Sequence, residues 1–339
     1  MAAQTHDKKL WVGMGISLFF LVLLFRKIEF AKLVAAFREM DYRFLWGALA
    51  STFVSFYLRA VRWRILLMPL KRTTLANLFP ATIIGYMANN ILPARLGEFV
   101  RAYVLAVKEG LDPSATFATL VLDRLCDGFT VLIILLVTFF TVRLPAGMES
   151  VQHGLVVGGY VTLAFYLGVV AFIVVLKRQT MRTLELLRLL LRPFPSRVAE
   201  KVIPLLGSFI EGLRLSSRPR ELAALFAVSL AIWVTAIIPV DGILRAFGIA
   251  LPVTASMFIM VFLVFAVMVP ASPGYVGTYH FACVTALQAF NIQSERALSV
   301  ALIIHGVNFF PVTLVGFYYL WRDKISLKGL EQRTSVGDH

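Results

Sequence analysis

The stretch that decides the fold of this chain is Asn89-Asn90-Ile91-Leu92-Pro93-Ala94-Arg95-Leu96-Gly97-Glu98-Phe99-Val100-Arg101. It interrupts the otherwise apolar segment 75–107 with a proline, a glycine and several ionisable side chains. Because proline lacks a backbone N–H, a helix is expected to break near Pro93 and to leave polar backbone groups unpaired. Such groups persist at membrane depth only when they are buried in protein or line a watery cavity. Segment 75–107 is therefore predicted to form a re-entrant helical hairpin.

The composition places the whole chain in a membrane. Of its 339 residues, 59% are hydrophobic and only 15% are charged, whereas soluble domains contain about 45–50% apolar residues. Most apolar residues lie in runs of about 16 to 24, a length that matches the roughly 30 Å hydrocarbon thickness of a bilayer. We therefore expect a single membrane domain over residues 1–339.

A second broken segment resembles the first. Segment 253–290 is interrupted at Pro270-Ala271-Ser272-Pro273-Gly274, so it is also predicted to form a re-entrant hairpin. The expected fold class is an all-α integral membrane protein with six full transmembrane helices and two oppositely oriented re-entrant helical hairpins. The expected spans are Leu10–Phe25, Phe44–Leu58, Thr116–Val142, Leu155–Leu176, Leu222–Leu244 and Ala297–Trp321.

The distribution of positive charge predicts the orientation. Basic clusters follow the second and fourth spans, and cytoplasmic loops carry an excess of Lys and Arg. Both termini are then expected in the cytoplasm. The chain divides into halves of inverted orientation, 1–176 and 221–322, joined by a cytoplasmic amphipathic linker, 177–220. A basic cluster at 26–43 conflicts with this scheme, so the orientation of the first two spans is left open and residues 28–40 are expected to form an interfacial helix.

The first broken segment contains a candidate anion site. Glu98 and Arg101 are three residues apart and are expected to pair on one helical face. Arg95 is then left without a partner. Inserting an unpaired cation into a membrane costs about 2.5 kcal/mol or more on insertion scales, so Arg95 is expected to have another partner. A phosphate is a suitable partner, because the guanidinium fork and a helix N-terminus after Pro93 both favour an anion. We predict that Arg95 and Arg101 meet a lipid head-group phosphate, with Asn90 and Glu98 beside it.

A second polar tract, Asp123-Arg124-Leu125-Cys126-Asp127, begins an otherwise apolar span. Asp123 and Asp127 share one helical face, with Arg124 beside them. The net negative charge of this second tract is expected to neutralise the net positive charge of the first tract across a helix interface. Two interpretations stay open. One is a structural ion network that fixes helix register. The other is a substrate or proton pathway, in which Glu98, Asp123 and Asp127 carry protons and Arg124 contacts the head group.

The second broken segment gives a third polar tract. Pro270 and Pro273 are expected to end one half-helix, and the next half-helix would point its N-terminal amides at a negative group. A membrane histidine is more often a packing residue than a proton carrier, and both roles are kept open for His280. The predicted head-group contacts are Ser272, Gly274, Tyr275, Gly277 and His280.

The three tracts, in this order, resemble the flippase-like family that contains the transmembrane region of lysylphosphatidylglycerol synthases and the YbhN-type inner-membrane proteins. The resemblance covers nearly the whole chain. It implies a bacterial or archaeal cytoplasmic-membrane protein that handles lipids, and one branch moves an aminoacylated phospholipid across the bilayer. This chain departs from the family pattern at Asp123, where Glu is usual. It also departs at Tyr275 and His280, in a tract that usually reads Pro-Gly-Gly-x-Gly followed by Glu, which argues against a shared carboxylate role there.

The leading functional hypothesis is flippase-like movement of an anionic lipid or lipid-linked head group through a polar groove between the hairpins. The alternatives are a membrane-embedded enzyme acting on a lipid or polyprenyl phosphate and a non-transporting lipid-binding scaffold. The synthase branch carries a soluble aminoacyl-transferring domain, and only residues 323–339 follow the last span here, so the chain is not expected to be an enzyme. Because the sequence has no Gly-x-x-x-x-Gly-Lys-Ser/Thr tract, uphill transport would use an ion gradient.

The charge also indicates the partners. The formal charge of +14 lies in short clusters beside apolar runs, which indicates lipid head groups and not nucleic acid. The expected partner is a membrane phospholipid or a polyprenyl-phosphate-linked lipid, and a homo-oligomer is left open. Cys126 and Cys283 are isolated within apolar segments and have no metal-binding spacing, so no metal and no cofactor are expected.

Overall fold

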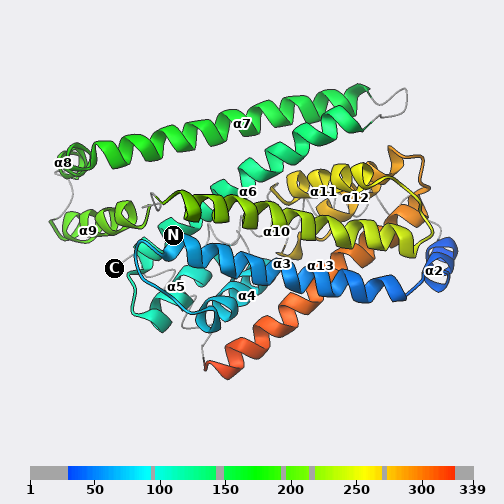
Figure 1. Cartoon of the computed structure of the whole chain (residues 1–339), viewed down its shortest axis with the longest axis horizontal. Coiled ribbons are helices and arrows are strands. Elements are labelled where there is room, and N and C mark those ends of the chain that lie inside the picture. Colours follow the sequence, from blue (N-terminus) through cyan, green and yellow to red (C-terminus); the bar gives the residue numbers. More distant parts are fainter. Residues whose placement is uncertain are drawn as a thin grey trace.

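The computed structural model describes residues 30–92, 96–142, 149–191, 196–213, 218–268 and 273–324. This part of the chain consists of helices and connections, without β-strands (Figure 1). The expected all-α class is confirmed. The expected first span, Leu10–Phe25, lies outside the described residues.

The described helices follow one another with short connections. Two pairs, α4–α5 and α11–α12, correspond to the two segments in which the sequence predicts a break. The bounds are α2 Phe30–Arg38, α3 Arg43–Leu67, α4 Leu75–Ile91, α5 Gly97–Glu109, α6 Pro113–Thr141, α7 Glu149–Arg178, α8 Thr180–Leu190, α9 Ser196–Gly212, α10 Pro219–Ala246, α11 Val253–Met268, the 3-10 turn η2 Pro273–Tyr275, α12 Thr278–Gln288 and α13 Ser294–Arg322.

Helix ends coincide with residues that start or stop helices. Leu92, which follows α4, has the extended backbone that a residue before proline prefers. Gly110 ends α5 with a left-handed φ of +63°. Asp112 caps α6, because its carboxylate accepts a hydrogen bond from the Ala115 N–H at 2.9 Å. The sequence therefore sets where α4 and α5, the helices on either side of the first break, come to an end.

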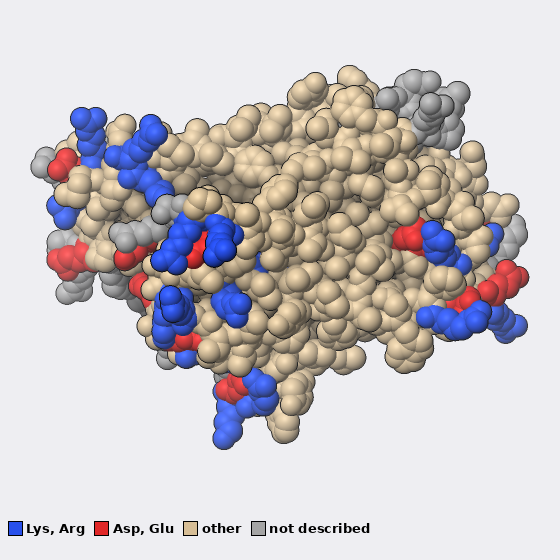
Figure 2. Space-filling model, in the orientation of Figure 1, with Lys and Arg blue, Asp and Glu red and all other residues tan. Residues whose placement is uncertain are grey.

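Four of the described helices are long and apolar enough to cross a membrane by length and composition. On the face shown in Figure 2, charged side chains gather at the two ends of the molecule and leave a nearly uncharged band between them. These observations support a multi-pass membrane protein, while six spans and re-entrant hairpins remain predictions. The four helices are Arg43–Leu67, Val156–Arg178, Pro219–Ala246 and Ser294–Arg322.

Two groups of helices repeat one arrangement in opposite directions (Figure 1). Helices α3 and α10 lie side by side and antiparallel, as the hydrogen bonds from Ser51 Oγ to the Thr235 carbonyl (2.7 Å) and from Ser55 Oγ to the Ile232 carbonyl (3.4 Å) show. Helix α4 packs against α13, and α11 packs against α6; likewise α2 contacts α13 and α9 contacts α6. Helices α2–α6 therefore correspond to α9–α13, with α7 and α8 between the groups. The expected boundaries at 176 and 221 remain a prediction.

Close contact between α4 and α5 depends on glycine. A Cβ built on Gly97 would lie 2.1 Å from the carbonyl oxygen of Gly85 and 2.5 Å from the side chain of Asn89. The Gly97 N–H also donates to Asn89 Oδ1 at 2.9 Å. The sequence predicts a helix break at Gly97, and in the structure this residue is the first of α5. It also allows the two helices to approach closely.

We expect Gly97→Ala to destabilise the fold by about 1–3 kcal/mol, because the atom that the new methyl group meets is a backbone oxygen that cannot move aside. The thermal unfolding midpoint of the purified protein in detergent checks this. Gly168→Ala is the matched control, since no atom lies within 4 Å of a Cβ built there on α7. Equal shifts in the two variants would contradict the packing argument.

Candidate functional site

Four charged side chains form a buried ion network between α3, α5 and α6. The carboxylate of Asp123 accepts hydrogen bonds from Arg62 Nε at 2.7 Å and Arg101 Nη1 at 3.0 Å. Arg62 Nη1 also lies 2.8 Å from Asp127 Oδ1. The side chains of Arg62 and Asp123 are fully buried. Two guanidiniums and two carboxylates cancel in charge, which is the condition under which ions are tolerated in an apolar interior.

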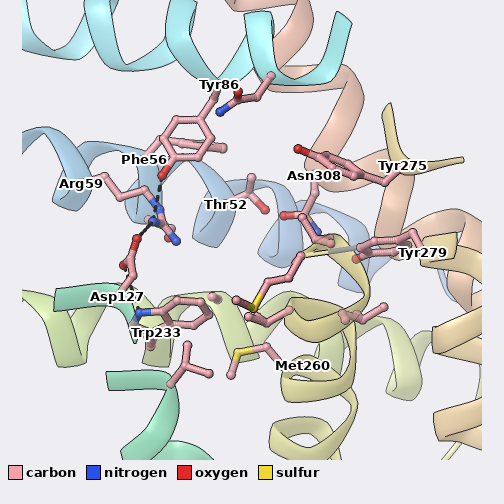
Figure 3. Close-up of a pocket in the computed structure, with 18 of the residues that line it drawn as sticks. Thr52, Phe56, Arg59, Tyr86, Asp127, Trp233, Met260, Tyr275, Tyr279 and Asn308 are labelled. Carbon is pink, nitrogen blue, oxygen red and sulfur yellow. Dashed lines mark hydrogen bonds and ion pairs between the residues drawn. The ribbon is translucent and has the colours of Figure 1, made fainter. Parts of the chain in front are cut away.

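Arg59 and Arg124 extend this network towards an open space. Both donate to the Tyr86 hydroxyl, at 2.9 and 3.0 Å, and both lie near Asp127 Oδ2, at 3.3 and 3.2 Å. Trp233 Nε1 donates to Asp127 Oδ1 at 3.2 Å. Figure 3 shows Arg59 lying between Tyr86 and Asp127. The two guanidiniums share the same two oxygen atoms and are held side by side.

Glu98 lies beside Arg124 and not beside its expected partner Arg101. Its Oε1 is 3.7 Å from Arg124 Nε. Arg101 turns instead to Asp123, and its guanidinium stacks on the Trp63 ring, 4.2 Å from the ring centre. The expected Glu98–Arg101 pair is therefore wrong. A pair on one helix contributes only about 0.2–0.5 kcal/mol, and the buried carboxylate on α6 attracts Arg101 more strongly.

Arg59 and Arg62 were predicted to lie outside the membrane, in the basic cluster that follows a span ending at Leu58. The structure shows that this prediction was wrong. Helix α3 continues to Leu67, and both arginines lie inside it. The available signal was the apolar run Ile65-Leu66-Leu67 beyond them, together with their separation of three residues, which puts them on one helical face.

Two histidines lie at the second break. Gly274 and Gly277 have φ values of +72° and +95°, which glycine tolerates readily. The Gly277 N–H donates to His280 Nδ1 at 3.4 Å, which assigns the His280 proton to Nε2, 3.1 Å from His305 Nδ1. This hydrogen-bond chain connects the start of α12 to α13.

The two breaks, far apart in the sequence, meet against α13. Asn90 Nδ2 at the end of α4 donates to Thr313 Oγ1 at 3.0 Å. A Cβ built on Gly274 would lie 3.6 Å from the Asn90 carbonyl oxygen and 3.0 Å from the Phe309 ring. Helix α4 also contacts the turn Pro273–Tyr275. The interrupted helices therefore face each other inside the bundle.

A cavity of about 470 Å³ lies between the ion network and the second break (Figure 3). Its apolar wall is the side of α11 that runs from Met260 to Met268. Tyrosines, a histidine and asparagines add hydrogen-bonding groups to the rest of the lining. The cavity is therefore amphipathic, because apolar, polar and charged side chains all line it. The charged end is lined by Arg59, Glu98, Arg124 and Asp127.

The structure places the predicted site residues in three groups. Those on the cavity wall are Asn90, Glu98, Arg124, Asp127 and Tyr275. Those in the buried network behind the wall are Arg101 and Asp123. Those at the second break are Pro273, Gly274, Gly277 and His280. Gly97 begins α5 at the contact with α4, and the remaining ones, Pro93, Arg95, Pro270 and Ser272, lie outside the described residues.

The fold and the site define a polytopic helical membrane protein with an internal charged cavity between two helix breaks. The chain belongs to the family of the lysylphosphatidylglycerol synthase TM region, whose model matches residues 10–316. The resemblance inferred from the three polar tracts is confirmed.

Curated relatives come from archaea. The chain is 26% identical over 330 residues to Glycosyltransferase AglD of Haloferax volcanii, covering 90% of this chain and 52% of that protein. It is 23% identical to a UPF0104 membrane protein of Pyrococcus horikoshii, covering 91% of this chain and 95% of that one. A UPF0104 membrane protein of Methanothermobacter thermautotrophicus is 24% identical, with 83% and 86% coverage. No solved structure matches.

The first of these relatives corrects one expectation. The chain was not expected to be an enzyme, yet a relative aligned over most of its length carries an enzyme's name. The chain spans about half the length of that relative. The name of this relative therefore overturns the expectation that the chain is not an enzyme.

Proposed function

We propose that this protein moves a lipid with an anionic head group across the bilayer, through the cavity between the two helix breaks. The observation that carries the proposal is the amphipathic cavity, which is lined both by two adjacent guanidiniums, Arg59 and Arg124, and by the apolar wall of α11. A lipid likewise has a charged part and an apolar part. Its phosphate suits the guanidinium forks and its chains suit the apolar wall.

The helical arrangement supports transport more than simple binding. The two groups of helices run in opposite directions, and their broken helices meet at the cavity. Secondary transporters commonly use inverted repeats with discontinuous helices at the substrate site, so that the site can open to either side in turn. In the proposed arrangement the basic ends of the fourth span and of α13 face the cytoplasm of a bacterium or archaeon.

Reconstitution into liposomes tests the proposal. Purified protein in vesicles that contain a fluorescent phosphatidylglycerol is expected to raise the rate at which external dithionite quenches label from the inner leaflet. Protein-free vesicles and vesicles with heat-denatured protein give the baseline. A rate equal to that baseline for every anionic lipid tested would exclude transport.

Tyr86 provides a conservative variant for this assay. Tyr86→Phe removes the oxygen that accepts hydrogen bonds from both Arg59 and Arg124, so the two guanidiniums lose a shared anchor while the ring stays. We expect transport to fall by about threefold to tenfold, the effect of losing about one ordinary hydrogen bond, because both guanidiniums keep their contacts with Asp127. Tyr160→Phe, on an exposed part of α7, is the matched control and is expected to keep the wild-type rate.

A second candidate function is chemistry on a glycosyl carrier lipid, which the similarity to a protein named glycosyltransferase favours. Incubation of the protein with polyprenyl phosphate and nucleotide sugars, followed by mass spectrometry of the lipids, tests it. A new glycosylated lipid would support this function. Unchanged lipid masses together with accelerated transbilayer movement would favour transport.

A further inference from the structure

Seven charged groups meet at the site. Arg62, Arg101 and Asp123 are buried behind the cavity wall, whereas Arg59, Arg124, Glu98 and Asp127 line the cavity. Arg62 and Arg124 each contact both aspartates, so the seven groups form one connected set. Four guanidiniums and three carboxylates leave this set with one positive charge in excess. Excess charge in an apolar surround is costly, so a ligand with one negative charge would complete the site.

The carboxylate of Glu98 is only partly engaged. Glu98 Oε1 is 3.7 Å from Arg124 Nε and 3.5 Å from Asn89 Nδ2, while Oε2 is buried and has no hydrogen-bond partner among the described residues. Its main effect on the cavity is therefore electrostatic. It offsets the charge of Arg124 without closing that guanidinium off, since 38% of the Arg124 side chain remains exposed.

Tyr86 adds a directional group beside these charges. Its oxygen accepts hydrogen bonds from Arg59 and Arg124, at 2.9 and 3.0 Å. A phenol that has accepted two donors still has its own O–H to give. The residue lines the cavity, so this O–H and the two guanidiniums form a compact set of donors suited to the oxygens of one phosphate.

From these charges we infer that the cavity selects a lipid whose head group carries a phosphodiester and a net charge of −1, and that Glu98 is the residue that determines this specificity. The inference rests on the proposed function in taking the cavity as the place where the lipid head group binds. With Glu98 present, the site carries one uncompensated positive charge and matches a phosphodiester. A phosphomonoester, which carries about −1.5 to −2 at pH 7, would leave negative charge beside the Glu98 carboxylate.

Lipid binding to the full chain in detergent tests the inference through native mass spectrometry. The probes are phosphatidylglycerol, phosphatidate and phosphatidylcholine with identical acyl chains. Wild-type protein is expected to prefer phosphatidylglycerol over both others. Glu98→Gln, which keeps the shape of the side chain and removes its charge, is expected to shift the ratio of phosphatidate to phosphatidylglycerol affinity by about tenfold towards phosphatidate, as the loss of one nearby charge predicts.

Two controls make the outcome decisive. Glu221→Gln removes a carboxylate that pairs with Arg218 at the start of α10, and it is expected to leave the lipid preference unchanged. Glycerophosphoglycerol, the same head group without acyl chains, is expected to compete weakly, and competition equal to that of the lipid would overturn the assignment of a lipid. A folded Glu98→Gln protein with the wild-type preference would overturn the role of Glu98.

This test separates the inference from transport. If wild-type protein shows the charge preference but does not accelerate lipid movement in liposomes, the transport proposal fails and the binding specificity stands. If it accelerates movement while Glu98→Gln leaves the preference unchanged, the inference fails and transport stands.

Discussion

Replacement of Arg62 by methionine is expected to destabilise the protein by about 3–5 kcal/mol, the range for removal of one partner from a buried ion pair. Arg62 is a fully buried cation that lies between Asp123 and Asp127, at 2.7 and 2.8 Å. Methionine fills much of the space but leaves two buried carboxylates without that cation. The free energy of unfolding in mixed micelles checks this result.

Two further variants show whether charge is the cause. Arg245→Met is the matched control, because Arg245 pairs with Asp241 at an exposed end of α10 and such pairs contribute only about 0–1 kcal/mol. Adding Asp123→Asn to Arg62→Met restores the net charge of the site and is expected to recover part of the lost stability. Similar losses in Arg62→Met and Arg245→Met would show that the buried network is not a stabilising core.

The double variant Arg59→Gln/Arg124→Gln is expected to reduce transport of an anionic lipid to within about twofold of the protein-free rate. The change turns the net charge of the site from one positive to one negative, because Arg62 and Arg101 then face three carboxylates, those of Glu98, Asp123 and Asp127. Two unit charges at 4 Å interact by about 4 kcal/mol at an effective dielectric constant of 20, so reversing the sign disfavours an anionic head group by orders of magnitude. Dithionite quenching in liposomes measures the rate.

The control for this variant changes the protein charge by the same amount at a distance. Arg43→Gln/Arg245→Gln removes two exposed arginines that pair with Asp41 and Asp241, and it is expected to keep the wild-type rate. A normal rate in the double variant of Arg59 and Arg124 would contradict the proposed head-group site. A low rate in both double variants would point to a loss of protein integrity.

The sequence supplied much of the architecture because backbone chemistry is local. Runs of apolar residues predict helices in a bilayer, and Pro93 predicts the end of a helix, which the extended Leu92 before it bears out. The tract at 123–127 was recognised as a charged site, and it lies at the centre of the network. Family membership followed from the order of the polar tracts. The expectation that the chain is not an enzyme was wrong, because a relative that aligns with most of it is named a glycosyltransferase.

By itself, the sequence determined which segments are helical, where two of them break and which charges lie within apolar surroundings. Only the tertiary structure decided the partners. Arg101 pairs with Asp123 and not with Glu98. Arg59 and Arg62, on α3, also belong to the site, whereas the sequence predicted charged partners only from the segments that form α5 and α6. The physical reason is that helix formation depends on neighbours a few residues away, whereas a buried charge is stabilised by whichever opposite charge the packing of distant helices brings within about 3 Å.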